Sequence, residues 1–293
     1  MEEFRELVLI LTTTPIYAIV IGLEMWYSHK HHRHLYSTKG TLSNVYLTVL
    51  NMGLDVIMRT ACLFILNYFY QYRFVDQYTN VFVYWTLLFF AEDLMYYWLH
   101  RIDHYSRFFW AVHVTHHSSE EYNLTVGFRS SVFQPLYRFI YFIPLSFLGF
   151  KGMDIMFIYS ATQIFGILVH TQTVGKLGFL EYFMVTPSHH RVHHASNVRY
   201  LDKNMGMVLI IWDKLFGTFQ EEEEKDPVKY GLTTNIKTYH PGKMVFHEWI
   251  NIFKDLKKKC SIKDKLLYLF GPPGWSHDGS TKTSSQLRAE LKD

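Results

Sequence analysis

Long apolar blocks separated by polar loops dominate the pattern of this chain. A helix needs roughly 17 to 25 mostly apolar residues to cross the hydrocarbon core of a bilayer. Three blocks have that length, over residues 7–27, 44–70 and 80–99. Two shorter apolar runs follow, over residues 136–150 and 153–169, and predict a tilted or re-entrant helical hairpin. The pattern therefore predicts an all-α polytopic membrane bundle with about four or five membrane-embedded helices.

The same pattern divides the chain into three segments. Residues 1–42 are expected to form an N-terminal anchor helix with a basic flank, and residues 43–220 a membrane domain that carries the chemistry. Residues 221–293 are expected to form a cytoplasmic C-terminal region. Within it, an apolar stripe over 245–259 predicts an amphipathic helix, which fits the membrane surface and the protein's own core equally well. The composition of residues 276–293 predicts a frayed polar tail.

Charges beside the first apolar block predict the orientation of the chain. Lys30, Arg33 and Lys39 follow this block, and short basic loops stay in the cytoplasm. Alternation across the later blocks then places residues 100–134, and everything after His170, on the same cytoplasmic face. We therefore expect an integral, multi-pass protein of the bacterial inner membrane or the endoplasmic reticulum. The histidines interleaved with these basic residues are expected to belong to the flank rather than to a metal-capture tract.

Composition narrows the class of protein further. The net charge of +3 is too small to indicate a nucleic-acid partner. Aromatic residues make up 18% of the chain and charged residues only 19%, which fits a membrane protein. Cys62 and Cys260 lie far apart, and neither belongs to a metal motif, so a disulfide framework is not expected. The anomaly is the number of histidines, which is 17.

Eight of these histidines fall into three clusters with helical spacing. They are His100 and His104; His113, His116 and His117; and His190, His193 and His194. Residues three and four apart share one face of a helix, so each cluster points its imidazoles one way. A structural zinc site takes four ligands, so eight imidazoles are too many for one ion and suit two. His170 and His189 are the reserve ligands, and no catalytic residue beyond the metal ligands is expected.

Two acidic positions in the apolar blocks also attract attention. Asp93 precedes His100 by two helical turns, and we expect it to orient a ligand imidazole. Asp55 stands four residues before Arg59. Lone charges inside a bilayer are costly, so these two side chains are expected to pair.

The histidines by themselves leave the metal and the chemistry open. Neutral imidazole suits zinc, copper, iron and nickel. A site beside lipid chains favours activation of dioxygen at iron, because unactivated C–H bonds need an oxidant that side chains cannot provide. Hydrolysis at a pair of zinc ions is the competing chemistry. A non-enzymatic membrane metal-binding protein is a further alternative, although the chain has few polar residues to line a path through a bilayer.

Four stretches resemble the fatty acid hydroxylase or sterol desaturase superfamily of membrane di-iron oxygenases. They are residues 93–101 (DLMYYWLHR), 109–123 (FWAVHVTHHSSEEYN), 186–194 (TPSHHRVHH) and 202–219 (DKNMGMVLIIWDKLFGTF). The chain is most similar to the alkylglycerol monooxygenase branch, and the resemblance covers residues 43–275. It implies that the eight clustered histidines hold two iron ions, with His170 matching a further histidine of the superfamily.

The resemblance also implies O2-dependent hydroxylation next to the ether oxygen of a glycerol ether lipid, which releases a fatty aldehyde. In that branch electrons come from tetrahydrobiopterin, and an acidic residue tied to the pterin follows the second histidine of the HxxxH motif. Tyr105 stands in that position here, so a pterin or a redox protein could supply the electrons. A sterol or fatty acyl desaturase or hydroxylase is the alternative function. Trp212, Asp213 and Thr218 also match a family signature, with either a fold-making or a catalytic role.

Overall fold

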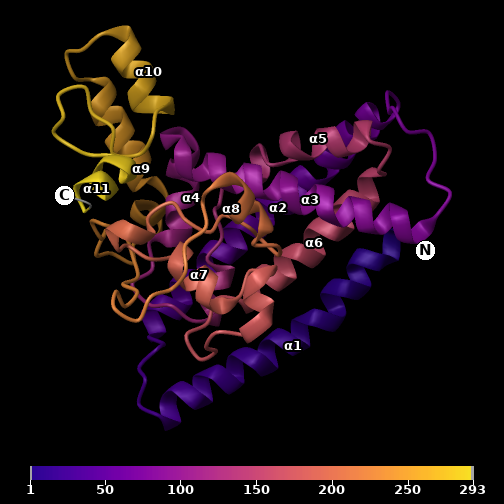
Figure 1. The fold of residues 1–293 in the computed structure, drawn as a ribbon, viewed down its shortest axis with the longest axis horizontal. Coiled ribbons are helices and arrows are strands. Elements are labelled where there is room, and N and C mark those ends of the chain that lie inside the picture. The colour runs from indigo at the N-terminus through magenta and orange to yellow at the C-terminus, as the bar shows by residue number, and fades with distance from the viewer. Residues whose placement is uncertain (1, 292–293) are drawn as a thin grey trace.

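The computed structural model describes residues 2–291, and almost all of its regular structure is helical (Figure 1). The α-helices are α1 (Glu2–Lys30), α2 (Thr38–Tyr70), α3 (Val81–Tyr105), α4 (Arg107–His117), α5 (Phe139–Phe147), α6 (Gly152–Leu168), α7 (Pro187–His193), α8 (Ile211–Phe216), α9 (Pro241–Leu256), α10 (Ile262–Phe270) and α11 (Ser284–Glu290). Within residues 2–291, β-structure is limited to isolated bridges. The all-α prediction is therefore confirmed.

Helices α1 and α2 are each long and apolar enough to cross a membrane. Large apolar side chains cover their outer surfaces: Leu11, Val56 and Phe64 are 63%, 69% and 75% exposed. Such side chains need an apolar neighbour, and lipid is the one that a spanning helix meets. Helix α6 is apolar but shorter. Helix α3 matches the third predicted block and continues beyond it into the first histidine cluster.

Helix α1 runs as a long diagonal rod along α6 (Figure 1). Polar contacts hold it at both ends. Near its start, Arg5 pairs with Asp154 at the beginning of α6, at 3.0 Å. Near its end, the buried carboxylate of Glu24 accepts a hydrogen bond from the backbone N–H of Leu124, at 2.8 Å. The anchor helix is thus tied to the segment that borders the histidines.

The apolar core lies between α2, α3, α5 and α6. Each helix contributes fully buried side chains to it, including Leu66, Leu99, Phe142 and Ile155. Close packing makes such a core resist small displacements. Because Leu99 directly precedes the first histidine of α3, this core provides a rigid base for the histidine clusters.

The predicted hairpin of two short apolar helices is present as α5 and α6. Gly149 joins them with φ +86°, and a Cβ atom there would meet the backbone carbonyl of Val75. Glycine adopts this left-handed conformation without steric cost, which explains its place in the turn. Both helices are shorter than full spans, at 9 and 17 residues.

The predicted pair between Asp55 and Arg59 is also present, with 3.2 Å between the charged atoms. Each side chain has a second partner that sequence spacing did not reveal. Arg59 also contacts Glu6 of α1, and Asp55 also contacts Arg138 beside α5. The charges therefore form one network that joins α1, α2 and α5, which lowers the cost of placing them among apolar helices.

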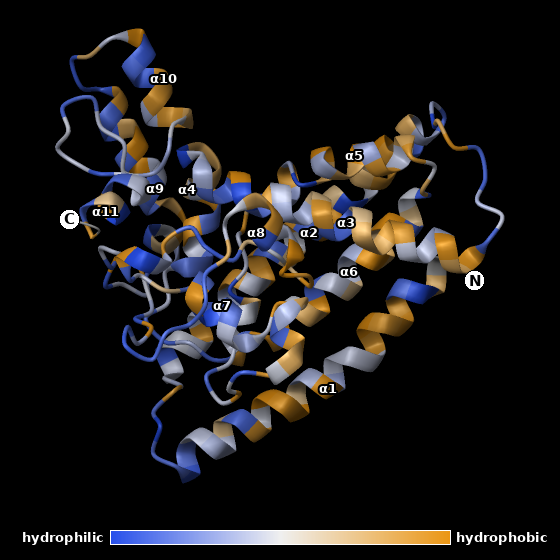
Figure 2. Ribbon diagram, viewed as in Figure 1, coloured by the Kyte–Doolittle hydropathy of each residue, from blue (hydrophilic) through white to orange (hydrophobic). Residues whose placement is uncertain are grey.

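The structure places one face of the predicted amphipathic helix against the protein and leaves another face exposed. Helix α9 packs on α4, where the rings of Trp249 and Phe108 lie 5.1 Å apart, and its Met244 and Ile252 side chains are buried. Another of its faces leaves Phe246 and Phe253 47% and 63% exposed. Figure 2 shows hydrophobic and hydrophilic residues alternating along α9 and α10.

The prediction of a frayed tail over residues 276–293 is wrong for residues 284–290. Residues 284–290 form α11, and the Thr283 side chain accepts a hydrogen bond from the Gln286 N–H in a capping box. Arg288 donates a hydrogen bond to the backbone carbonyl of Leu201, which ties α11 to the body. Residues 292–293 lie outside the described part of the chain.

Substituting Gly127→Ala tests how closely the segment after α4 packs against α6. A Cβ atom there would lie 2.9 Å from the Ile167 Cα atom and 3.1 Å from His170 Nδ1. We expect a loss of about 1–3 kcal/mol in the free energy of unfolding, because backbone atoms must move. Thermal unfolding of the purified protein measures this loss.

Gly53→Ala is the matched control, because a Cβ atom in that position of α2 meets nothing within 4 Å. It should leave the melting temperature unchanged or raise it slightly. Equal melting temperatures for the two variants would contradict the described packing.

Candidate metal centre

Four elements bring nine of the predicted histidines together. They are α3 with His100 and His104; α4 with His113, His116 and His117; the end of α6 with His170; and α7 with His190, His193 and His194 just after it. A single residue, Ser106, separates α3 from α4, so the first two clusters are held at a fixed corner. Eight of the nine imidazoles are buried and His116 is half-buried.

The nine histidines form two groups. In each group, one nitrogen from every imidazole lies within 4.8 Å of the corresponding nitrogens of the others. The five-histidine group contains His100, His104, His113, His117 and His193, and the four-histidine group contains His116, His170, His190 and His194. The α4 cluster contributes to both groups, and so does the α7 cluster. The arrangement therefore resembles two adjoining metal sites rather than one large one.

Backbone carbonyls determine which nitrogen carries the hydrogen in four of these rings. The Nδ1 atoms of His100, His116, His170 and His193 lie 2.8, 2.8, 2.7 and 3.0 Å from the carbonyl oxygens of Met205, Arg129, Gly166 and Lys203. A carbonyl oxygen can only accept a hydrogen bond, so each Nδ1 carries the hydrogen. In a neutral imidazole, each Nε2 of these rings then keeps a free lone pair.

These Nε2 atoms point at one another. His170 Nε2 lies 3.3 Å from His116 Nε2, and neither of them has a hydrogen to donate. His100 Nε2 lies 3.1 Å from His113 Nε2. In the described part of the chain, the buried His193 Nε2 has no hydrogen-bond partner. Converging lone pairs away from water are unfavourable unless a cation lies between them, so the donor set fits metal ions.

Burial also keeps the rings in the form that binds metal. It lowers the pKa of His190, His193 and His194 well below the usual value of histidine, and the neighbouring imidazoles lower it further. Burial lowers the pKa of His116 to about 4. These imidazoles are therefore neutral near pH 7, which is the state that donates a lone pair to a metal.

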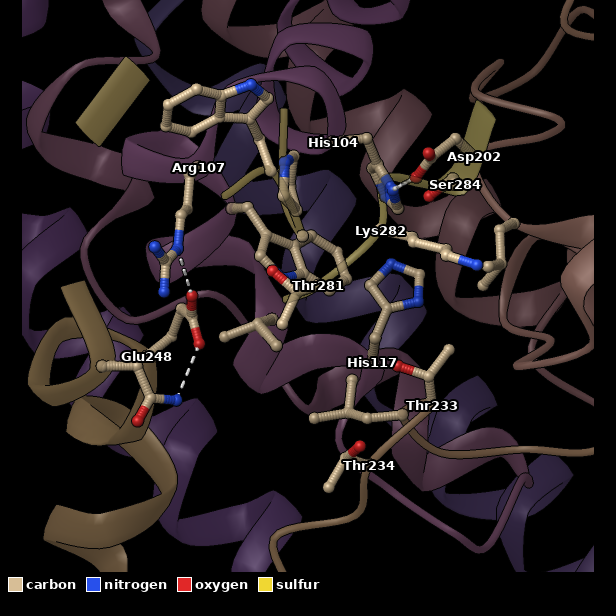
Figure 3. Close-up of a pocket in the computed structure, with 18 of the residues that line it drawn as sticks. His104, Arg107, His117, Asp202, Thr233, Thr234, Glu248, Thr281, Lys282 and Ser284 are labelled. Carbon is tan, nitrogen blue, oxygen red and sulfur yellow. Dashed lines mark hydrogen bonds and ion pairs between the residues drawn. The ribbon is translucent and has the colours of Figure 1, made fainter. Parts of the chain in front are cut away.

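A cavity of about 510 Å³ adjoins the five-histidine group (Figure 3). His104, His117 and His193 line its inner end, beside the indole of Trp110. Residues 231–236 and segments from α9 to α11 form much of the remaining wall. The C-terminal region, which was expected to end in a frayed tail, thus encloses the space next to the histidines.

Residues 85–218 match the family profile of the fatty acid hydroxylases. All nine grouped histidines lie within this range. The segment is a fatty acid hydroxylase domain. The predicted family is therefore confirmed for residues 85–218, and members of this family depend on iron.

Several curated proteins are similar to this chain. It is 42% identical over 195 residues to an alkylglycerol monooxygenase of Homo sapiens, which covers 65% of this chain and 42% of the human protein. A Caenorhabditis elegans alkylglycerol monooxygenase is 40% identical over 202 residues, or 65% of this chain and 40% of that protein. The ornithine lipid hydroxylase OlsE of Rhizobium tropici is 29% identical over 141 residues, or 48% and 43%.

The chain spans less than half the length of these relatives. No solved structure matches it.

Asp93 supports His100 indirectly, through a loop, whereas its sequence position predicted a direct contact with an imidazole. Its carboxylate accepts hydrogen bonds from the Val208 N–H at 2.9 Å and from the Trp212 indole at 2.9 Å, and it contacts no imidazole. It holds the loop that carries Met205, and the Met205 carbonyl accepts the His100 Nδ1–H. Asp93 thus orients His100 through a backbone segment.

Asp213 anchors the same loop from the other side. Its carboxylate accepts hydrogen bonds from the Met205 N–H at 2.6 Å, the Gly206 N–H at 2.8 Å and the Thr218 hydroxyl at 2.6 Å. Of the two roles left open for the family signature, these contacts favour the fold-making one. The signature residues hold in place the carbonyl that orients His100.

Asp103 is a buried carboxylate that the sequence analysis did not select. Its Oδ2 atom lies 3.9 Å from His113 Nδ1, and the carboxylate accepts hydrogen bonds from Gln134 at 2.8 Å and Tyr137 at 2.6 Å. Its position immediately before His104, between the two histidines of the HxxxH motif, was the available signal.

Arg129 is a second buried residue that sequence patterns did not indicate. It donates hydrogen bonds to the Thr115 carbonyl at 2.8 Å and the Ser118 hydroxyl at 2.7 Å, at the C-terminal end of α4. A cation there stabilises the partial negative charge of the helix end. Its own carbonyl accepts the His116 Nδ1–H. No local pattern in the sequence marks this role.

His189 does not join either group. Its Nε2 atom lies 3.1 Å from a Glu181 carboxylate oxygen, and its Nδ1 atom lies 3.2 Å from the Met184 carbonyl. Tyr105 is 40% exposed and lies beside the Arg101 guanidinium. The histidines of residues 29–34, at the end of α1 and just after it, are exposed and lie outside both groups.

Asp93→Asn should weaken metal binding although Asp93 touches no imidazole. Loss of the carboxylate frees the loop that carries Met205, and metal affinity should fall about 10- to 100-fold. Competition with a chelator of known affinity measures the change. Asp76→Asn, at an exposed loop position, is the control and should retain wild-type affinity. Unchanged affinity in Asp93→Asn would contradict this role.

The metal-free protein should lose stability as the pH falls from about 7 to about 5. Unfolded histidine takes up a proton near pH 6.5, whereas buried His116 does so only near pH 4. Between these values the unfolded state binds more protons, so acid favours unfolding. Melting temperatures recorded across this range check the prediction. A flat profile would show that these imidazoles are accessible to protons in the folded state.

Proposed function

We propose that this protein is a membrane di-iron monooxygenase that uses O2 to hydroxylate glycerol ether lipids next to the ether oxygen. The product is a hemiacetal, which separates into a fatty aldehyde and a glycerol derivative. Similarity to alkylglycerol monooxygenases over 65% of the chain supports the substrate class. The observation that carries the proposal is the convergence of nine imidazoles into two adjoining groups inside a fatty acid hydroxylase domain.

Each histidine group would hold one iron ion. His100, His104, His113, His117 and His193 would hold the first, and His116, His170, His190 and His194 the second. Bound iron would supply the oxidant for an unactivated C–H bond, with one oxygen atom entering the lipid and the other leaving as water. This balance requires two electrons from a reductant. Because Tyr105 replaces the acidic residue tied to the pterin, a pterin and a redox protein both remain candidate donors.

The chain's own residues orient the ligands and limit the access of water. The carbonyls of Met205, Arg129, Gly166 and Lys203 hold the Nδ1–H groups, which leaves the Nε2 lone pairs free and would let them bind the two ions. A rigid, buried donor set keeps the geometry that the chemistry needs and restricts side reactions with bulk water.

We also propose that the protein crosses the membrane several times, with the histidine groups at the cytoplasmic face of a bacterial inner membrane or the endoplasmic reticulum. The exposed apolar surfaces of α1 and α2 support membrane insertion. Three basic residues around the loop between α1 and α2, namely Lys30, Arg33 and Lys39, support the orientation, because basic flanks remain cytoplasmic. The exposed apolar side chains of α9 fit contact with the membrane surface.

A second candidate is a hydroxylase or desaturase that acts on another lipid. Two weaker similarities support this candidate. The chain is 29% identical to an ornithine lipid hydroxylase, and it is 26% identical over 162 residues to a human lathosterol oxidase. Mass spectrometry of lipid extracts separates the candidates. Loss of ether lipids on expression supports the first, and altered sterol or acyl unsaturation supports the second.

The purified protein should contain about two iron ions per chain, as the two histidine groups require. His117→Ala should lose iron and should form no fatty aldehyde from an alkylglycerol in the presence of O2 and a reductant. Reactions with a tetrahydropterin and with a redox-protein system should both be run. Metal analysis and product identification by mass spectrometry provide the two readouts.

His34→Ala is the matched control, because this histidine is exposed and lies outside both groups. It should retain both iron and turnover. A wild-type protein with its full iron content that changes no lipid in an O2-dependent reaction would refute the proposed function.

A further inference from the structure

The cavity beside the five-histidine group has a wall that the hydroxylase domain does not supply. His104, His117 and His193 lie at its inner end, within residues 85–218. Its outer wall comes from residues 231–236 and from α9 to α11. Anything that fills the cavity therefore touches both the metal ligands and the C-terminal region, whose chemistry can select among ligands.

The cations that line this cavity already have carboxylate partners. Arg107 donates hydrogen bonds to Glu248 and to Asp255, each at 2.7 Å. Lys258 pairs with the other oxygen of Asp255 at 2.8 Å, and Lys282 pairs with Glu290 of α11. A phosphate group needs an available cation to offset the loss of its hydration. The lining offers it no such partner.

The wall offers groups suited to uncharged polar ligands instead. Thr233, Thr234, Thr281 and Ser284 place hydroxyl groups around the cavity (Figure 3). Hydroxyls can donate and accept hydrogen bonds, so they match the hydroxyls of a polyol without requiring charge. Closer to His104, the Trp110 ring lies 5.1 Å from the imidazole and adds an apolar surface.

We propose that this cavity holds the uncharged, hydroxyl-bearing headgroup of the lipid, and that Glu248 excludes phosphate-bearing headgroups by neutralising Arg107. This inference rests on the proposed function. Oxidation next to the ether oxygen requires the headgroup to lie within a few bonds of the metal, and this cavity is the polar space that meets His104 and His117. Glu248 is thus a specificity-determining residue on α9.

Binding of two short, water-soluble probes tests the inference without turnover. The iron-loaded protein, kept free of O2 and reductant, is titrated calorimetrically with 1-O-butylglycerol and with its 3-phosphate. The wild type should bind the neutral probe at least about tenfold more tightly, because the phosphate would enter without a free cation. Glu248→Gln releases Arg107 from one partner and should reduce this ratio to about one or reverse it.

Two further variants keep the result interpretable. Thr234→Lys adds an unpaired cation at an exposed position of the wall and should also favour the phosphate probe, with little risk to folding. Glu223→Gln removes a carboxylate from the pair with Arg199, outside this cavity, and should leave the ratio unchanged. Iron content confirms that each variant is folded.

Several outcomes would overturn the inference. One is equal affinity of the wild type for both probes, and another is the same change of ratio in Glu223→Gln as in Glu248→Gln. Binding of a reduced pterin by a wild type that ignores butylglycerol would reassign the cavity to the reductant. The expected binding ratios without any lipid oxidation would refute the proposed function but support the headgroup site.

Discussion

Converging imidazole lone pairs are the constraint on which the rest of this structure depends. Nine histidines direct nitrogens into two small buried spaces, and four of them are forced to do so by carbonyl oxygens that hold the opposite ring nitrogen. Such an arrangement is unfavourable for the protein alone, since buried lone pairs face one another with no hydrogen to share, as between His116 and His170. It becomes favourable when metal ions supply the missing positive charge. The fold must therefore hold the rings in place from outside.

Buried charged residues around the histidine groups hold the carbonyls that orient the imidazole rings. The loop after α7 is anchored by two carboxylates, Asp93 from α3 and Asp213 at the start of α8, and the anchored segment presents the Met205 carbonyl to His100. Arg129 holds the end of α4 and presents its own carbonyl to His116. Buried charges are costly unless they are fully hydrogen-bonded, so these residues stabilise the site only as complete networks. The C-terminal region adds a separate function, because it closes a polar cavity over the five-histidine group.

Much of the site could be predicted from sequence because helical spacing is a local property. The three clusters and His170 are all in the two groups, and the apolar blocks correspond to α1, α2 and α3. The partners of the histidines could not be predicted in this way. They are mainly backbone carbonyls, which lie between 4 residues away, for His170, and 105 residues away, for His100. A carbonyl is present at every residue and so leaves no sequence signal. Asp93 illustrates the point, since its position on the helix was informative but its true partner is a loop 115 residues away.

His189 and the C-terminal tail show two other limits of prediction from the sequence. His189 has helical spacing to His193, but a local carboxylate at Glu181 takes its Nε2 atom away from the groups. The tail has the composition of a disordered segment, yet α11 is ordered by a capping box and by the contact of Arg288 with Leu201. A nearby carboxylate decided the first case, and a helix cap together with one tertiary contact decided the second. The most direct test of the account is anomalous diffraction at the iron edge from crystals of the iron-loaded protein. We predict two iron peaks, one enclosed by the five-histidine group and one by the four-histidine group. A single peak, or iron bound at the exposed histidines of residues 29–34, would contradict the account.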